Sequence, residues 1–156
     1  MKIGIIVHSH TGNTLLVAQR LKEKLSAAGQ SAFIERVSAV NDEEGDIQKI
    51  RLNRNPDISA YDVLLFGAPV RGFSLSMVMQ AYLHGVETLK GKKIACFMTQ
   101  GFPAPWMGGK RALKQLIEIC QSKGATPYGT GIVNWPNVDK REKLIQAVVE
   151  ELCAIR

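Results

Sequence analysis

Short apolar segments alternate with segments of helical spacing along the chain, and this alternation limits the fold more than any other feature. Three of the apolar segments are almost continuous hydrophobic runs, as strands buried on both faces are. Strands that alternate with helices favour a parallel sheet, because each parallel connection must cross the sheet from end to end. The sequence therefore predicts an α/β fold with a five-stranded parallel sheet between layers of helices. The strands are expected at residues 2–7, 32–37, 63–67, 93–99 and 126–133, and the helices at 13–28, 76–89, 109–123 and 140–154.

Two parts of this scheme rest on weaker patterns. Residues 38–62 mix acidic, apolar and polar positions, and we expect a short or broken helix and a polar loop there. Asp139 and Glu142 lie three positions apart ahead of an apolar run, which is the spacing of a capping box. We therefore expect Asp139 to cap the last helix.

The length and composition are typical of a single domain, spanning residues 1–156. Hydrophobic residues make up 46% of the chain and charged residues 22%, as in ordinary globular proteins. No apolar run approaches the roughly 20 residues of a membrane span. The first apolar run ends at His8, too early for a signal peptide. We expect a cytoplasmic protein with no membrane partner.

The distribution of charges, cysteines and histidines argues against nucleic-acid binding, a disulfide framework and a metal site. The formal net charge is +6, but no helix carries an uninterrupted basic face, so we expect no nucleic-acid partner. Cys96, Cys120 and Cys153 show no paired spacing, which argues against a disulfide framework or a structural zinc site. We expect all three to be buried, inert thiols. No histidine is spaced to ligate a metal with another His, Asp or Glu, and we predict no metal site.

The segment Ser9-His10-Thr11-Gly12-Asn13-Thr14 connects the first predicted strand to the first predicted helix. Such a turn directs backbone N–H groups and hydroxyls to one point, and the helix N-terminus adds partial positive charge there. Gly12 permits torsions or a close approach that a side chain would prevent. The segment predicts a phosphate site, although the same residue types also serve as ordinary helix caps. His10 would either contact the phosphate or point to solvent, and both arrangements remain open.

Two further loops leave strands whose carboxyl ends should meet at the same edge of the sheet. They comprise residues 67–74 and 99–106, and both are rich in Gly and Pro. Both also carry aromatic residues, in a chain that is only 6% aromatic. Rigid, aromatic loops beside a phosphate site predict a planar ring held between walls, with backbone groups at its polar edge.

The turn and the two loops together resemble the flavodoxin family, and the similarity extends over nearly the whole chain. The family motif S/T-x-T-G-x-T is matched by Ser9, Thr11, Gly12 and Thr14. The resemblance implies a flavodoxin-like three-layer sandwich with strand order 2-1-3-4-5 and a non-covalently bound FMN, a placement for which flavodoxin is a standard example. The cofactor-binding residues that it implies are Ser9, His10, Thr11, Gly12, Asn13, Thr14, Ala68, Pro69, Val70, Arg71, Gly72, Phe73, Thr99, Gln100, Gly101 and Phe102.

Two functions of different classes follow from this resemblance. One is an electron carrier whose partner is another redox protein, and the short chain favours it. The other is an FMN-dependent NAD(P)H oxidoreductase acting on quinones or similar small acceptors, because residues 66–83 resemble flavodoxin-like NAD(P)H:quinone reductases. Two features depart from the carriers, which are typically strongly acidic and hold the ring between a Trp and a Tyr. This chain is basic, and its corresponding loops offer Val70, Arg71, Phe73, Phe102 and Trp106. A flavin-free descendant that binds another phosphate ligand or a protein is the third interpretation.

Arg71 is placed near the flavin ring by the same resemblance. A positive charge there would favour the reduced, anionic flavin. Electron or hydride transfer by a bound flavin needs no catalytic side chain, so we expect no catalytic residues. The sequence leaves the electron donor, the acceptor and the oligomeric state open.

Overall fold

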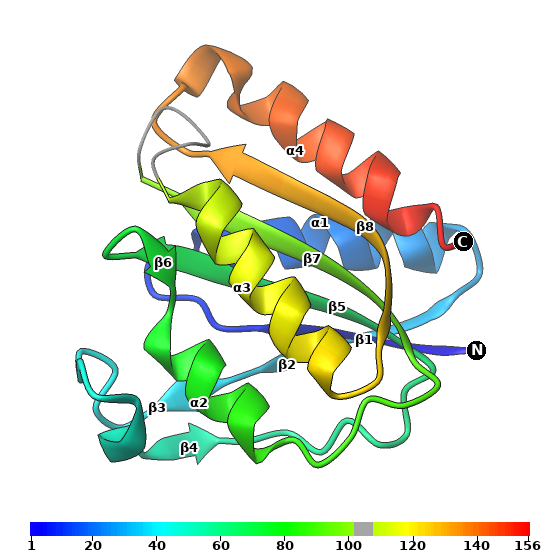
Figure 1. The fold of residues 1–156 in the computed structure, drawn as a ribbon. Helices are drawn as coiled ribbons and strands as arrows, with labels where there is room; N and C mark the ends of the chain where they lie inside the picture. Colours follow the sequence, from blue (N-terminus) through cyan, green and yellow to red (C-terminus); the bar gives the residue numbers. More distant parts are fainter. Residues whose placement is uncertain (102–107) are drawn as a thin grey trace.

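Five parallel strands form the centre of the protein, in a computed structural model that describes residues 1–101 and 108–156 (Figure 1). The strand order is the predicted one, with the first strand between the second and the third. Each strand runs parallel to its neighbours, so their carboxyl ends share one edge of the sheet. Across the sheet, the strands are β2 (Ser31–Arg36), β1 (Lys2–Val7), β5 (Val63–Arg71), β7 (Lys93–Gln100) and β8 (Thr126–Asn134).

Two pairs of helices cover the two faces of the sheet and form the outer layers of a three-layer sandwich (Figure 1). One hydrophobic core lies between the sheet and helices α1 (Asn13–Ala27) and α4 (Val138–Cys153). The other lies beneath α2 (Met77–Gly85) and α3 (Gly109–Ser122). The alternate residues of β1 divide between the cores, since Ile5 belongs to the first and Ile6 to the second. Burial on both faces explains the continuous apolar runs in the sequence.

The second predicted loop is partly a strand. β5 continues to Arg71, four residues past the predicted end, and returns as the antiparallel strand β6 (Ser74–Leu75). Gly72 and Phe73 form the tip of this hairpin with φ angles of 59° and 63°. Positive φ at both central positions is the geometry of a type I′ turn, whose twist matches that of paired strands. Beyond the five parallel strands, β6 therefore adds a short sixth strand to the sheet.

The segment at 38–62 differs from the prediction. It contains one short 3-10 helix, η1 (Ile47–Lys49), and two strands that were not expected, β3 (Ser38–Ala39) and β4 (Leu52–Arg54). β3 and β4 pair as an antiparallel ribbon beside α2. Ile50, which follows η1, and Leu52 of β4 pack against the core under α2. Tertiary packing overrides the local pattern here.

Two smaller predictions are corrected. The last helix starts at Val138 after Asn137, and no side chain caps it. Glu142, the predicted capping partner, instead accepts hydrogen bonds from Arg20 of α1 at 2.6 and 2.8 Å. Cys96 and Cys120 are buried as expected, whereas Cys153 is only partly buried. No helix within residues 1–101 and 108–156 is long and apolar enough to cross a membrane.

Candidate functional site

The phosphate turn lies at the carboxyl edge of the sheet, between β1 and α1. Gly12 adopts a left-handed φ of 93°, and among the described residues beyond its chain neighbours no atom lies within 4 Å of the position that a Cβ would take. The Oγ of Ser9 accepts a hydrogen bond from the backbone N–H of Leu15 at 3.2 Å. α1 has no acidic residue in its first turn. The turn thus leaves an open position at a positive helix end, which suits an anion.

Thr14 connects the phosphate turn to the loop after β7. Its Oγ1 lies 2.8 Å from the Oγ1 of Thr99, and both residues are buried. This hydroxyl pair holds two of the three predicted loops together. Thr14 therefore supports the position of the turn.

A cavity of about 230 Å³ lies where the three loops meet. Nine predicted cofactor residues line it, namely His10, Thr11, Asn13, Pro69, Val70, Arg71, Thr99, Gln100 and Gly101. Six others lie outside the cavity wall, namely Ser9, Gly12, Thr14, Ala68, Gly72 and Phe73. Phe102 and Trp106 lie outside the described residues. The topology thus gathers residues that are up to 91 positions apart, from His10 to Gly101, around one space.

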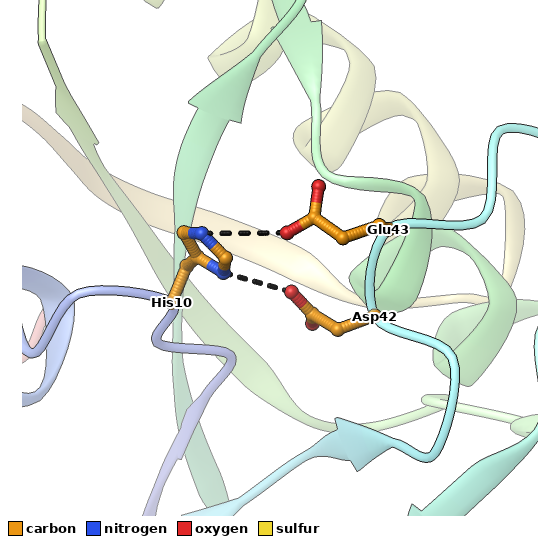
Figure 2. A group of neighbouring side chains, drawn as sticks. All are labelled: His10, Asp42 and Glu43. Carbon is orange, nitrogen blue, oxygen red and sulfur yellow. Dashed lines mark hydrogen bonds and ion pairs between the residues drawn. The ribbon is translucent and has the colours of Figure 1, made fainter.

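An acidic loop, residues 41–46, borders this cavity. It connects β3 to η1, and its Asp42 accepts a hydrogen bond from His10 between Nδ1 and Oδ2 at 2.8 Å. Glu43 lies on the other side of the same ring, with 3.5 Å between its Oε1 and Nε2 of His10 (Figure 2). His10 is therefore held by carboxylates on both of its ring nitrogens.

Arg71 binds the same acidic loop. Its guanidinium donates to Oδ2 of Asp42 at 2.9 Å, to the backbone oxygen of Asp42 at 3.1 Å and to Oε2 of Glu43 at 2.8 Å. Two carboxylates thus balance the charge of Arg71. The effect of this ion-paired arginine on a flavin stays a prediction.

His8 connects the acidic loop to the protein interior. Its Nε2 lies 2.6 Å from Oδ1 of Asp42, and its Nδ1 lies 2.9 Å from the Oγ of Ser76. Burial lowers the pKa of His8 below its ordinary value, against the opposing effect of the hydrogen bond to Asp42. In the neutral ring, Nε2–H donates to the carboxylate and Nδ1 accepts from the Ser76 hydroxyl. Ser76 is fully buried at the start of α2, so this Ser-His-Asp arrangement cannot present a nucleophile to a substrate.

Asp42 therefore receives hydrogen bonds from three side chains, those of His8, His10 and Arg71. Burial alone would raise the pKa of Asp42, but the hydrogen bonds from both histidines and the charge of Arg71 lower it overall. Sequence reasoning missed this residue. The available signal was an acidic run, Asp42-Glu43-Glu44, in a chain whose net charge is positive.

The structure brings together one group that sequence spacing did not suggest. Ligand atoms of His10, Asp42 and Glu43 lie within 4.8 Å of one another, a separation compatible with metal binding. The same two carboxylates already bind the Arg71 guanidinium, however, and a cation there would have to displace it. The absence of a metal stays a prediction.

Asn134 ends β8 beside Gln100 of β7. Its Oδ1 is buried and accepts no hydrogen bond from the described residues.

We expect the stability of the protein to fall between pH 7.5 and 5.5 because of His8. Its pKa is lower in the fold than in the unfolded chain, so the unfolded state binds more protons as the pH falls through about 6.5. The loss cannot exceed about 1.4 kcal/mol per pH unit for one group. Urea unfolding at both pH values measures it. The His8→Gln variant should lose this dependence and the exposed His84→Gln variant should keep it, whereas greater stability at pH 5.5 would contradict the assignment.

Solved structures match the protein in fold, whereas no family model and no curated protein matches its sequence. Two-electron reduced flavodoxin from Megasphaera elsdenii is 27% identical with a TM-score of 0.63, and the alignment covers 95% of this chain and 98% of that one. Oxidised flavodoxin 1 from Bacillus cereus is 22% identical with a TM-score of 0.67, and all of both chains align. The WrbA-like flavodoxin from Agrobacterium tumefaciens is 13% identical with a TM-score of 0.72, covering 97% and 94%.

The strand order places the protein among the doubly wound α/β proteins, whose ligands usually bind at the switch in strand order. The solved structures narrow this class to the flavodoxin-like fold, over almost the whole chain. The predicted fold and family resemblance are confirmed.

Proposed function

We propose that the protein binds FMN non-covalently at the cavity between the three loops and transfers electrons through it. The observation that carries this proposal is the convergence of the phosphate turn and two further loops on one cavity at the switch in strand order. FMN has a phosphate and a planar ring joined by a flexible chain, and the cavity offers an anion site at one end and apolar walls at the other.

Three features of the structure fit this cofactor. The turn has an open position at Gly12, and α1 has no carboxylate in its first turn to repel a phosphate. Pro69 and Val70 supply an apolar wall.

The cavity volume of about 230 Å³ is smaller than that of usual small-molecule sites, which enclose roughly 300–1,000 Å³. A bound flavin would therefore keep part of its surface exposed. When bound, FMN supplies the redox chemistry, and the residues of this chain bind it, orient it and set the charge around it. An exposed ring edge suits electron exchange with a second molecule.

An NAD(P)H oxidoreductase is the second candidate function. The observation in its favour is the site wall itself, which has Val70 and Arg71 where the carriers that this chain resembles typically place aromatic rings. A ring with one face less covered would be accessible to a nicotinamide or a small acceptor. Both candidates need FMN. They differ in the electron donor, which is a partner redox protein for the carrier and NAD(P)H for the oxidoreductase.

Titration of the purified protein with FMN, followed by flavin fluorescence and absorbance, tests the proposal. We expect saturable binding of one FMN and quenched flavin emission. Addition of NADH or NADPH alone then separates the two candidates, because rapid bleaching supports the oxidoreductase and bleaching only with an added reductase supports the carrier. A protein that does not bind FMN would refute both.

A further inference from the structure

The tip of the β5–β6 hairpin exposes an aromatic side chain in a strained conformation. Phe73 has a φ of 63° and is 51% exposed. The left-handed region is unfavourable for a bulky L-residue, and glycine or asparagine usually takes this place in a type I′ turn. Strain of this kind is retained most often where the residue has a function.

The start of α3 packs directly against this tip. A Cβ on Gly108 would lie 2.8 Å from the Cα of Phe73 and 2.8 Å from Cγ1 of Val70, so the helix reaches both the hairpin and the cavity wall. The next two residues after Gly109 are Lys110 and Arg111, in the first turn of α3. Both side chains are exposed, and neither forms an ion pair within the described parts of the chain.

Two cations at this place are electrostatically unfavourable for the helix. The N-terminus of a helix carries partial positive charge, and acidic residues are preferred there. The first turn of α3 contains none. These two exposed cations therefore do not stabilise the helix that carries them and are available for an anionic partner.

We propose that Phe73, Lys110 and Arg111 form the docking surface for an acidic electron-transfer protein. The proposal rests on the electron-transfer function above. Aromatic residues and arginine are enriched in the energetic centres of protein interfaces, and exposed cations speed the approach of a partner with opposite charge. The surface adjoins Val70, so a partner bound to it would lie beside the cavity.

Amide shift mapping by NMR tests this surface, with an acidic [2Fe–2S] ferredoxin as the probe. We expect shifts at residues 72–74 and 108–114 at low ionic strength, and their loss in 0.5 M salt. Equal shifts over the whole surface would overturn the proposal, as would shifts at these residues from inorganic pyrophosphate but none from ferredoxin. The latter would assign the surface to a small anion.

Two charge-reversal variants supply the matched comparison. Lys110→Glu with Arg111→Glu removes the cations of the proposed surface, and carboxylates at this helix end should preserve the helix. Lys22→Glu with Lys24→Glu changes the net charge by the same amount on exposed positions of α1, away from its first turn. We expect ferredoxin affinity to fall at least fivefold in the first variant and less than twofold in the second. Equal losses would show an effect of net charge alone and would refute the proposal.

Phe73→Asn tests the aromatic contribution, because asparagine tolerates the left-handed conformation. We expect at least threefold weaker ferredoxin binding, with unchanged amide shifts in the rest of the protein. If the variant bound ferredoxin with wild-type affinity, Phe73 would not be part of the docking surface. The mapping works with or without FMN. Failure to bind FMN therefore refutes the proposed function, and a failed mapping with normal FMN binding refutes this surface alone.

Discussion

Replacing Gly12 by alanine should weaken FMN binding by about tenfold or more, which corresponds to about 1.4 kcal/mol. The Cβ would clash with no residue in the described part of the chain, since none beyond the chain neighbours lies within 4 Å of its position. It would instead enter the open space of the phosphate turn, where the backbone must approach the ligand closely. The loss should therefore appear in the dissociation constant measured by fluorescence titration.

The change also strains the backbone, because alanine at a φ of 93° is unfavourable by roughly 1 kcal/mol. Gly29→Ala is the matched control. Gly29 has a φ of 80° and equally open surroundings, but it lies in the turn between α1 and β2. We expect both variants to lose similar stability and only Gly12→Ala to lose FMN affinity. If the two variants bound FMN with equal affinity, the proposal that the FMN phosphate binds at this turn would be refuted.

Replacing Gly67 by alanine should reduce the free energy of unfolding by about 3 kcal/mol, at the upper end of the usual cost of overpacking. Gly67 lies in β5 directly beside Phe97 of β7, and a Cβ there would lie 2.1 Å from Cζ of the Phe97 ring. Phe97 is fully buried between α1, α4 and the sheet, so the ring has no free space to move into. Thermal unfolding should show a decrease of roughly 6–12 °C in Tm.

A second variant shows whether the contact is the cause. In a Phe97→Leu background the ring is gone, and the cost of Gly67→Ala should fall by at least half in a double-mutant cycle. Gly85→Ala serves as a control, since its Cβ would approach no other element in residues 1–101 and 108–156 and its φ needs no glycine. We expect that control to change stability by less than about 1 kcal/mol. An undiminished cost in the leucine background would contradict the steric explanation.

The strands and helices could be predicted from the sequence because their patterns are local. β1 was predicted with its observed bounds, and α1 differs from its prediction by one residue. The segment at 38–62 could not be predicted, because Ser38 pairs with Arg54 over a distance in sequence that no local pattern shows. The hairpin tip could not be predicted for another reason, because Phe73 adopts a left-handed conformation that its residue type disfavours.

The candidate site was predictable in its location and only partly in its chemistry. The turn and loops predicted the cavity because strand topology alone brings their ends together. The hydrogen bonds of Asp42 were not predictable, since the carboxylate meets His8 and Arg71 only after the ribbon has folded against the sheet. Charge compensation at Arg71 is therefore a property of tertiary structure.

The strand order has a consequence for how the chain assembles during synthesis. β1 pairs with β2 and β5, so the centre of the sheet is complete once the ribosome has released residues up to Arg71. β7 then pairs with β5, and β8 pairs with β7, so each later parallel strand adds to the edge of the sheet that is already formed. α4 comes last, and its Glu142 binds Arg20 of the first helix. The sheet can thus grow outward in the order of translation. The last helix, α4, then completes the hydrophobic core that it shares with α1.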